Sequence, residues 1–201
     1  MPIAAFCAIM VKMQGVSDFM RKTKKELLVK SFQDLALQKP ISKITITNIT
    51  DNCGLSQPTF YRYFKDKYDL IAWAYISDTE EIMGRIGEHG YQWRDTLYDG
   101  LRYFDKNRSL AVNALKHTSG RDAFMRQMER INIDLLCNEI RKTIMTEKIP
   151  DDILDMVKIY CYGTVRLMCE WLNDNLPITP ERLAEVMEQS LPEPLKVYLY
   201  P

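Results

Sequence analysis

The fold is decided by residues 45–70, which read TITNITDNCGLSQPTFYRYFKDKYDL. Thr45 is a typical N-cap residue, because its hydroxyl can accept a free N–H at the start of a helix. The residues that follow predict a short helix over positions 46–52, with Ile46 and Ile49 on its inward face. The stretch therefore begins with a capped, one-sided helix.

A second short helix follows after a tight turn. Gly54 lies in the turn, where glycine reaches backbone conformations that side chains resist. Ser56 is the next N-cap, and the predicted helix runs from residue 57 to residue 63. Two short helices joined by a glycine-containing turn of three or four residues are typical of a helix-turn-helix, whose second helix enters the major groove of DNA.

The side chains of this segment suit DNA. Thr45, Ser56 and Thr59 offer hydroxyl groups that can bind phosphate oxygens. Gln57 can reach base edges, for instance with two hydrogen bonds to adenine. Lys67 lies at the start of the next predicted helix, where its ammonium can reach the DNA backbone.

The charge of the chain is segregated, although 27 basic and 27 acidic residues cancel in total. Zero net charge argues against a nucleic-acid-binding protein, because the surface that binds nucleic acid is usually basic. However, residues 1–75 hold 11 Lys and Arg against 6 Asp and Glu, and residues 76–201 hold 16 against 21. Residues 20–67 alone carry 10 basic and 4 acidic side chains, which is a footprint suited to DNA.

The pattern T-I-x-x-I-x-x-x-C-G-L-S-x-x-T-F-Y-x-Y-F-x-D-K-x-x-L closely resembles the N-terminal domain of TetR/AcrR-family transcriptional regulators. The resemblance covers about residues 21–70 with the spacing of the family. Thr50 and Cys53 stand where the family usually has alanine, and both are small enough to fit. The resemblance implies an all-α homodimer whose N-terminal three-helix domain binds a palindromic operator. It also implies a C-terminal helical domain that dimerises and often holds a ligand.

Carried over by motif position, the resemblance implies DNA contacts for nine residues. The expected phosphate contacts are Thr45, Ser56, Thr59, Tyr61 and Lys67, and the side chains expected to face bases are Gln57, Pro58 and Tyr63, with Arg62 beside them. Phe60 and Phe64 are expected in the core rather than on DNA.

The rest of the chain also has helical periodicity, so the fold class is all-α with about nine helices. The expected division is an N-terminal extension at residues 1–19, a helix-turn-helix domain at 20–66 and a dimerisation and ligand domain at 67–201. We expect the extension to be poorly ordered. Its apolar run Pro2–Val11 also fits a helix packed on the body, or a segment before a true start at Met13 or Met20.

Apolar residues at helical spacing in the C-terminal part indicate either core packing or specific sites. The candidate ligand-binding residues are Tyr98, Phe104, His117, Phe124, Met128 and Tyr160. The last two expected helices, at about 153–173 and 180–190, match the elements that form the dimer interface in the family. The candidate interface residues are Val157, Cys161, Gly163, Thr164, Met168, Trp171, Leu183, Val186 and Met187.

Three segments resemble more loosely a branch of the family that includes regulators of dihydroxyacetone kinase. They are Lys65–Trp73, Asn113–Phe124 and Tyr162–Trp171. That branch includes members that act through a protein partner. The expected function is thus a DNA-binding transcriptional regulator. We expect it to repress transcription, and a small molecule is a candidate for controlling its binding to DNA. The alternative is a co-regulator that works through a protein partner.

Other classes of function have little support. The five cysteines are widely spaced without a C-x-x-C pair, so reduced thiols are expected and no disulfide framework, metal site or cofactor. No nucleophile–base motif or phosphate-binding glycine-rich loop indicates an enzyme. No apolar run reaches the ~20 residues that span a membrane, and a cytoplasmic protein is expected.

Overall fold

The computed structural model describes residues 23–118, 124–146 and 148–200. Within these ranges the chain forms ten α-helices, one short 3-10 helix and no strand, which confirms the all-α expectation. The expected extension at residues 1–19 lies outside the described residues. The predicted windows correspond to helices, and the helix they missed is α11 (Glu193–Leu199), a short segment that begins just after Pro192.

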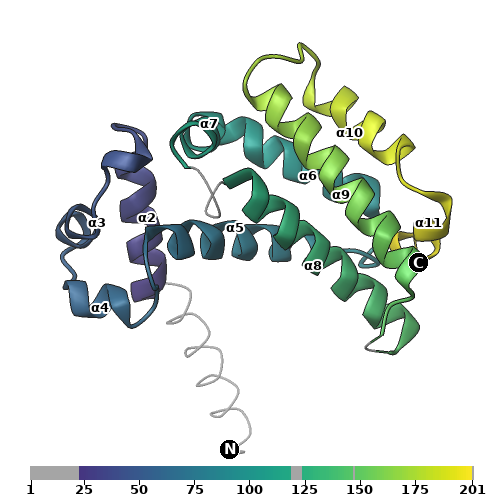
Figure 1. The fold of residues 1–201 in the computed structure, drawn as a ribbon, viewed down its shortest axis with the longest axis horizontal. Helices are drawn as coiled ribbons and strands as arrows, with labels where there is room; N and C mark the ends of the chain where they lie inside the picture. Colours follow the sequence, from purple (N-terminus) through teal and green to yellow (C-terminus); the bar gives the residue numbers. More distant parts are fainter. Residues whose placement is uncertain (1–22, 119–123, 147, 201) are drawn as a thin grey trace, which may run out of the picture.

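The first group of helices lies at one end of the molecule (Figure 1). It consists of α2 (Lys24–Ala36), η1 (Ile41–Lys43), α3 (Ile46–Cys53) and α4 (Gln57–Tyr61). Phe60 and Phe64 are fully buried in this group, as predicted, and their rings contact each other at a centroid distance of 5.7 Å. Two aromatic rings thus hold the short helix α4 against its neighbours.

Local capping accounts for the ends of α3 and α4. The Thr45 hydroxyl accepts the N–H of Asn48, whose side chain accepts the N–H of Thr45. Gly54 ends α3 with φ of 68°, in the left-handed region where other residues are strained. The Ser56 hydroxyl accepts the N–H of Thr59 and begins α4. The helix-turn-helix is therefore encoded by residues within the segment itself.

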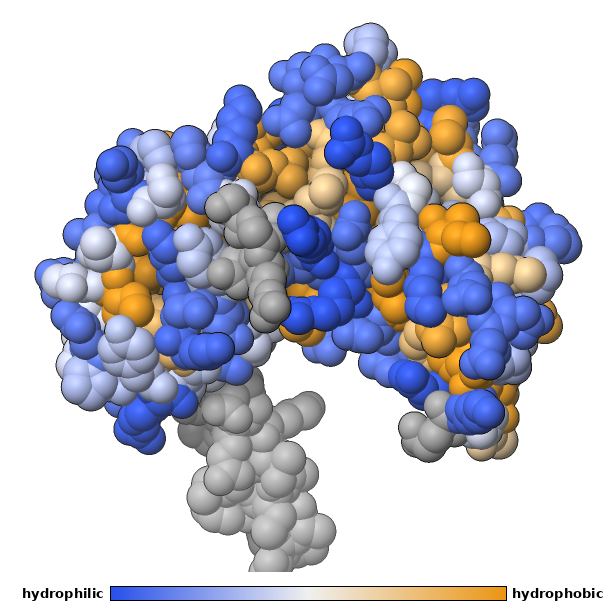
Figure 2. All heavy atoms as spheres, in the orientation of Figure 1, coloured by the Kyte–Doolittle hydropathy of each residue, from blue (hydrophilic) through white to orange (hydrophobic). Residues whose placement is uncertain are grey.

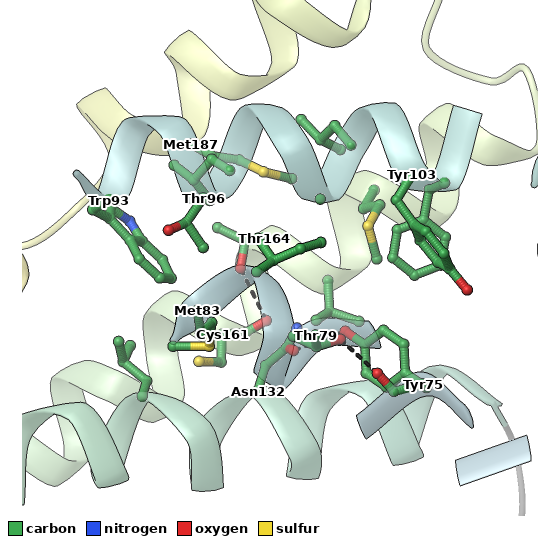
Figure 3. Close-up of a pocket in the computed structure, with 18 of the residues that line it drawn as sticks. Tyr75, Thr79, Met83, Trp93, Thr96, Tyr103, Asn132, Cys161, Thr164 and Met187 are labelled. Carbon is green, nitrogen blue, oxygen red and sulfur yellow. Dashed lines mark hydrogen bonds between the residues drawn. The ribbon is translucent and has the colours of Figure 1, made fainter. Parts of the chain in front are cut away.

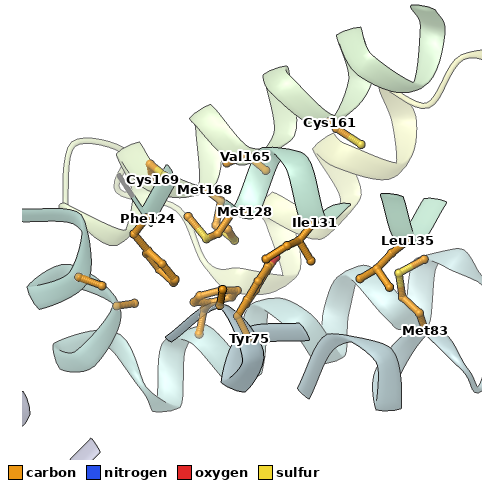
Figure 4. Close-up of a cluster of buried hydrophobic side chains, with 14 of the residues drawn as sticks. Tyr75, Met83, Phe124, Met128, Ile131, Leu135, Cys161, Val165, Met168 and Cys169 are labelled. Atoms are coloured by element: carbon orange, nitrogen blue, oxygen red, sulfur yellow. The ribbon is translucent and has the colours of Figure 1, made fainter. Parts of the chain in front are cut away.

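The second group is a larger helical body. Its helices are α5 (Lys67–Met83), α6 (Trp93–Lys106), α7 (Arg108–His117), α8 (Phe124–Ile144), α9 (Asp151–Leu172), α10 (Pro180–Gln189) and α11. Figure 1 shows α5 running from the first group into the body. In the core of the body, Tyr75 of α5 meets Phe124 and Met128 of α8 and Met168 of α9 (Figure 4).

The two groups are joined at η1 by a set of side-chain to backbone hydrogen bonds from Asn113 and Lys67, which we call the clasp. Asn113 of α7 accepts the N–H of Ile41 at 3.0 Å through its side-chain oxygen. Its amide nitrogen donates to the carbonyls of Ala36 at 2.6 Å and Lys39 at 2.9 Å. One side chain of the body therefore satisfies three backbone groups between α2 and η1, including a carbonyl left free at the end of a helix.

Lys67 closes the same clasp from α5. Its ammonium donates to the carbonyls of Ile41 at 2.8 Å, Ser42 at 3.3 Å and Ile44 at 2.9 Å. Burial lowers the pKa of this ammonium below its ordinary value. Because an ammonium has three N–H donors, all of them are engaged inside the protein. The phosphate contact expected for Lys67 stays a prediction, and the structure adds a structural role that the sequence did not indicate.

The helix α7 that carries Asn113 is itself fixed to α9. Arg108, its first residue, donates to the carbonyls of Trp171 at 2.9 Å and Leu172 at 3.1 Å. The guanidinium also lies 4.3 Å from the centroid of the Trp171 ring, a cation–π contact. The helix α7 is thus anchored at its start to the end of α9 and in its middle to the first group.

We predict that Asn113→Ala destabilises the protein by about 1–3 kcal/mol, because three backbone groups lose their partner. Urea unfolding followed by circular dichroism measures the change. Lys116→Ala, on an exposed position of the same helix, is the matched control and is expected to change stability by less than about 0.5 kcal/mol. Equal effects of the two variants would contradict the clasp.

We also predict that Lys67→Met lowers the free energy of unfolding by about 1–3 kcal/mol in the absence of DNA, since three carbonyls lose a charged donor. The same unfolding experiment measures it. An unchanged free energy of unfolding, together with weaker DNA binding, would instead leave Lys67 with the phosphate role alone.

Candidate nucleic-acid interface and internal cavity

The outer surface of α4 brings together most of the residues expected to contact DNA. Six of them are exposed at α4 and its two ends, namely Ser56, Gln57, Pro58, Tyr61, Arg62 and Tyr63. Tyr61 is 57% exposed, although a large aromatic side chain is usually more deeply buried. Thr45 is exposed at the start of α3, and Thr59 is half-buried beside Ser56. A polar surface that carries exposed tyrosines is suited to binding another molecule.

Gln57 is held in place by the neighbouring helix. Its amide nitrogen donates to the hydroxyl of Thr47 on α3 at 2.9 Å. The hydroxyls of Ser56 and Thr59 lie 2.9 Å apart. Thr47 was missed by the sequence reasoning, although its exposed hydroxyl two residues after the Thr45 cap was a signal. The side chain of Gln57, whose contact with a base stays a prediction, is therefore oriented by α3.

Basic side chains around α4 are not all equivalent. Lys25 of α2 lies 4.3 Å from the Trp73 ring centroid and 5.5 Å from that of Phe64, so it is held against α5. Lys39 donates to the side chain of Asn48 at 3.0 Å. Arg62 is exposed. Some of the basic side chains counted in residues 20–67 therefore also make contacts that stabilise the fold.

A cavity lies inside the body, between α5, α6, α8, α9 and α10 (Figure 3). Its volume is about 100 Å³, which is smaller than the ~300–1,000 Å³ usual for ligand pockets, and it is open toward the surface. Most of its wall is apolar or aromatic, and its lining residues include Trp93, Leu101, Phe104, Leu136, Val165 and Met168.

The polar groups of the cavity are mostly bonded to one another or to the backbone. The Tyr75 hydroxyl donates to the Asn132 side-chain oxygen at 2.8 Å, and the Thr164 hydroxyl donates to the Tyr160 carbonyl at 2.8 Å. Burial raises the pKa of the Tyr75 hydroxyl above its ordinary value, so that it stays protonated. These groups are neutral and satisfied.

One acidic residue lines this cavity. Asp78 accepts a hydrogen bond from the hydroxyl of Tyr103. Burial raises the pKa of the Asp78 carboxyl, while the bond from Tyr103 acts in the opposite direction. The carboxylate is therefore already partnered by the protein.

Three of the predicted ligand residues lie at cavities. Phe104 and Tyr160 line the main cavity. Phe124 lines a smaller one, of about 50 Å³, which lies between α7 and the first group and which Ile41 also lines. The aromatic periodicity thus identified part of the wall, while the polar cavity residues Asn132 and Thr79 were missed because each is polar at an apolar position of its helix.

The other three predicted ligand residues do not line either cavity. Met128 is fully buried and packs in the core. Tyr98 lies on the outer side of α6, where its hydroxyl is 3.4 Å from the Glu181 carboxylate. His117 is exposed at the end of α7. The sequence showed that these residues are on helices but not which way each helix faces.

Most of the predicted interface residues are buried inside the protomer, and their place in a dimer interface stays a prediction. Val157, Cys161, Met168, Trp171, Leu183 and Met187 are buried within the single chain. They form the inward stripe of α9 and α10, because α8 packs along α9 and α6 packs along α10. Thr164 and Val186 are partly buried, and Gly163 alone of the nine is exposed.

The outward stripe of α9 carries apolar side chains instead. Ile159 is 72% exposed and Tyr162 is 49% exposed, next to Gly163 and Arg166. A Cβ added at Gly163 would meet no atom within 4 Å. Figure 2 shows apolar side chains among polar ones on the surface formed by α9 and α10. This stripe, Ile159–Arg166, lies in the same turns of α9 as several of the predicted residues, but it faces away from the core and includes the predicted Gly163.

Among residues 23–118, 124–146 and 148–200, none of the helices combines the length and the apolar character needed to cross a membrane. The same ranges hold no group of three or more His, Cys, Asp and Glu side chains suited to a metal ion.

Comparisons with known proteins agree with this geometry. A curated relative from Lactococcus lactis subsp. lactis (strain IL1403), the "HTH-type dhaKLM operon transcriptional activator DhaS", is 28% identical over 83 residues. That alignment covers 41% of this chain and 44% of the relative, so the chain matches less than half of the relative's length.

Solved structures share the fold at low identity. The "Dihydroxyacetone kinase operon activator DhaS" superposes with a TM-score of 0.60 at 19% identity, over 87% of this chain and 97% of that one. A TetR transcriptional regulator from Rhodococcus sp. RHA1 has a TM-score of 0.57 at 15% identity, over 83% and 94% of the two chains.

Two family profiles match the chain in the order of its two helical groups. Residues 34–73 match "Bacterial regulatory proteins, tetR family", and residues 91–193 match "Transcriptional regulator C-terminal region". The second match alone covers more than half of the chain. Proteins of this family are regulators and not enzymes. The chain belongs to the TetR family of DNA-binding transcriptional regulators.

Proposed function

We propose that the protein acts as a homodimer that binds a palindromic operator through two copies of α4 and represses transcription there. The observation that carries this proposal is the exposed, polar and tyrosine-rich surface of α4. On this surface Gln57 is hydrogen-bonded to Thr47, and the side chain of Tyr61 is exposed. Two symmetric α4 helices would read half-sites about one helical turn apart, roughly 34–36 Å.

The outward stripe of α9 supports the dimer. Ile159 and Tyr162 expose apolar surface that association would bury, and each buried apolar side chain favours association. Gly163, which follows Tyr162, lets a second helix approach closely. In this arrangement the end of α9 is also tied to α7 through Arg108, so the dimer contact and the clasp at η1 are mechanically linked.

The main cavity supports control by a small molecule. It lies between α5, which begins next to α4, and α9, which carries the outward stripe. A ligand that separates these helices would change the spacing of the two α4 helices in the dimer. Loss of operator binding would then follow, because both half-sites must be read at once.

Activation is the second candidate direction, because the relative DhaS is named a transcriptional activator. A reporter gene placed behind the operator distinguishes the two. Removal of the protein raises expression if it represses and lowers expression if it activates. A partner-dependent co-regulator would show no regulation by the purified protein alone in a transcription assay reconstituted on the same operator.

We predict that Gln57→Ala changes which bases are preferred, by about 1–3 kcal/mol of discrimination at one position of each half-site, since the amide reads a base edge. Tyr61→Phe is predicted to weaken binding to all sequences alike, because its hydroxyl contacts phosphate. Duplexes selected from a random pool by the wild-type protein, followed by gel shifts, measure both effects. Two variants with the same uniform effect, or selection of no palindrome, would contradict these roles.

We predict that the double change Ile159→Glu, Tyr162→Glu produces a monomer and weakens operator binding at least tenfold, because charge is placed at the proposed contact. Met145→Glu is the matched control, since Met145 is 92% exposed at the end of α8 and away from this stripe. Sedimentation equilibrium measures the mass. If the double variant remained a dimer, the contact would have to lie on another face.

A further inference from the structure

The wall of the main cavity is unsuited to a charged ligand. No lysine, arginine or histidine is among the described residues that line it, so an anionic group would meet no counter-charge from them. The one acidic residue, Asp78, already accepts the hydroxyl of Tyr103. Burial of an unpaired charge in an apolar site is strongly unfavourable. The cavity therefore selects against carboxylates and phosphates.

The hydroxyl and indole protons of the wall are also committed. Tyr75 donates to Asn132, Thr79 donates to the Tyr75 carbonyl at 2.7 Å, and Trp93 donates to the Tyr160 hydroxyl at 3.1 Å. Tyr160 in turn donates to the carbonyl of Met187 at 3.0 Å. A polyol would have to break these bonds or leave its own hydroxyl groups without partners, and both are costly.

Asn132 offers the exception. Its side-chain oxygen is occupied by Tyr75, whereas no hydrogen bond joins its amide nitrogen to another of the described residues. Every fully buried side-chain nitrogen and oxygen in those residues has a partner, so this unpartnered nitrogen keeps some accessible surface. Figure 3 shows Asn132 reaching from α8 toward the middle of the cavity. It is thus a hydrogen-bond donor directed into an apolar site.

We propose that the cavity binds an uncharged, largely apolar molecule that presents one carbonyl or ether oxygen to the amide nitrogen of Asn132. This inference rests on the proposed control by a small molecule and names its chemical class. The aromatic and methionine side chains bury the apolar part of the ligand, and methionine adapts to its shape. Dihydroxyacetone, the compound in the name of the relative DhaS, is outside this class because it is small and hydroxylated.

Isothermal titration calorimetry with a matched series tests the class on the full-length protein. The probes are 2-nonanone, nonanoate, nonyltrimethylammonium and dihydroxyacetone. We expect saturable binding of 2-nonanone, at least tenfold weaker binding of the two ions, and no binding of dihydroxyacetone. Tighter binding of either ion or of dihydroxyacetone would overturn the proposal, and so would the absence of 2-nonanone binding.

Two variants locate the ligand. Asn132→Asp keeps an acceptor for Tyr75 but replaces the donor with a carboxylate oxygen, so the affinity for 2-nonanone is expected to fall about tenfold. Gly100→Leu fills the cavity from α6, where an added Cβ meets no atom within 4 Å, and is expected to abolish binding. Gly100→Ala is the control that leaves most of the space open. Unchanged binding to Gly100→Leu would place the ligand elsewhere and contradict the proposal.

These titrations contain no DNA, so they are independent of the operator experiments. Operator binding without 2-nonanone binding would refute the ligand class alone. Binding of 2-nonanone by a protein that selects no operator would refute the proposed regulator while the ligand class stands.

Discussion

The hydrogen bonds of Ile41 hold the two parts of this molecule together. Its N–H is accepted by Asn113 of α7, its carbonyl accepts the ammonium of Lys67 of α5, and its side chain is fully buried. Because both partners belong to the body, these bonds help to fix the orientation of the helix-turn-helix relative to the body, together with the bonds of Asn113 to Ala36 and Lys39. The Ile41 carbonyl also accepts the N–H of Ile44 at 3.1 Å, which closes the turn of η1.

The same residue links the clasp to the interior. The smaller cavity is lined by Ile41 as well as by Tyr75, Tyr103 and Phe104, and these three aromatic side chains also line the main cavity. A displacement of these three shared side chains would therefore change the packing around Ile41 in η1. Helix α7 adds a second connection, from the end of α9 through Arg108. In the proposed regulator, ligand and dimer contact thus act on the reading helix through the same short segment.

The sequence predicted the features that depend on residues close together in the chain. The Thr45 cap, the Gly54 turn and the Ser56 cap each involve residues only a few positions apart, so the sequence pattern alone indicates them. Asn113, which lies 72 residues from Ile41, has no such signal. The periodicity of α9 separated its two faces but did not show which face α8 covers. That is why most of the predicted interface residues lie in the core, while the exposed apolar residues Ile159 and Tyr162 were not among those predicted.

A crystal structure of the protein bound to a duplex that it has selected tests the account most directly. The account predicts α4 in the major groove, with Gln57 at a base edge and Tyr61 at a phosphate. It also predicts that Lys67 and Asn113 keep their bonds to the backbone around Ile41. A complex in which Lys67 has left these carbonyls for a phosphate while the Asn113 clasp is open would contradict it.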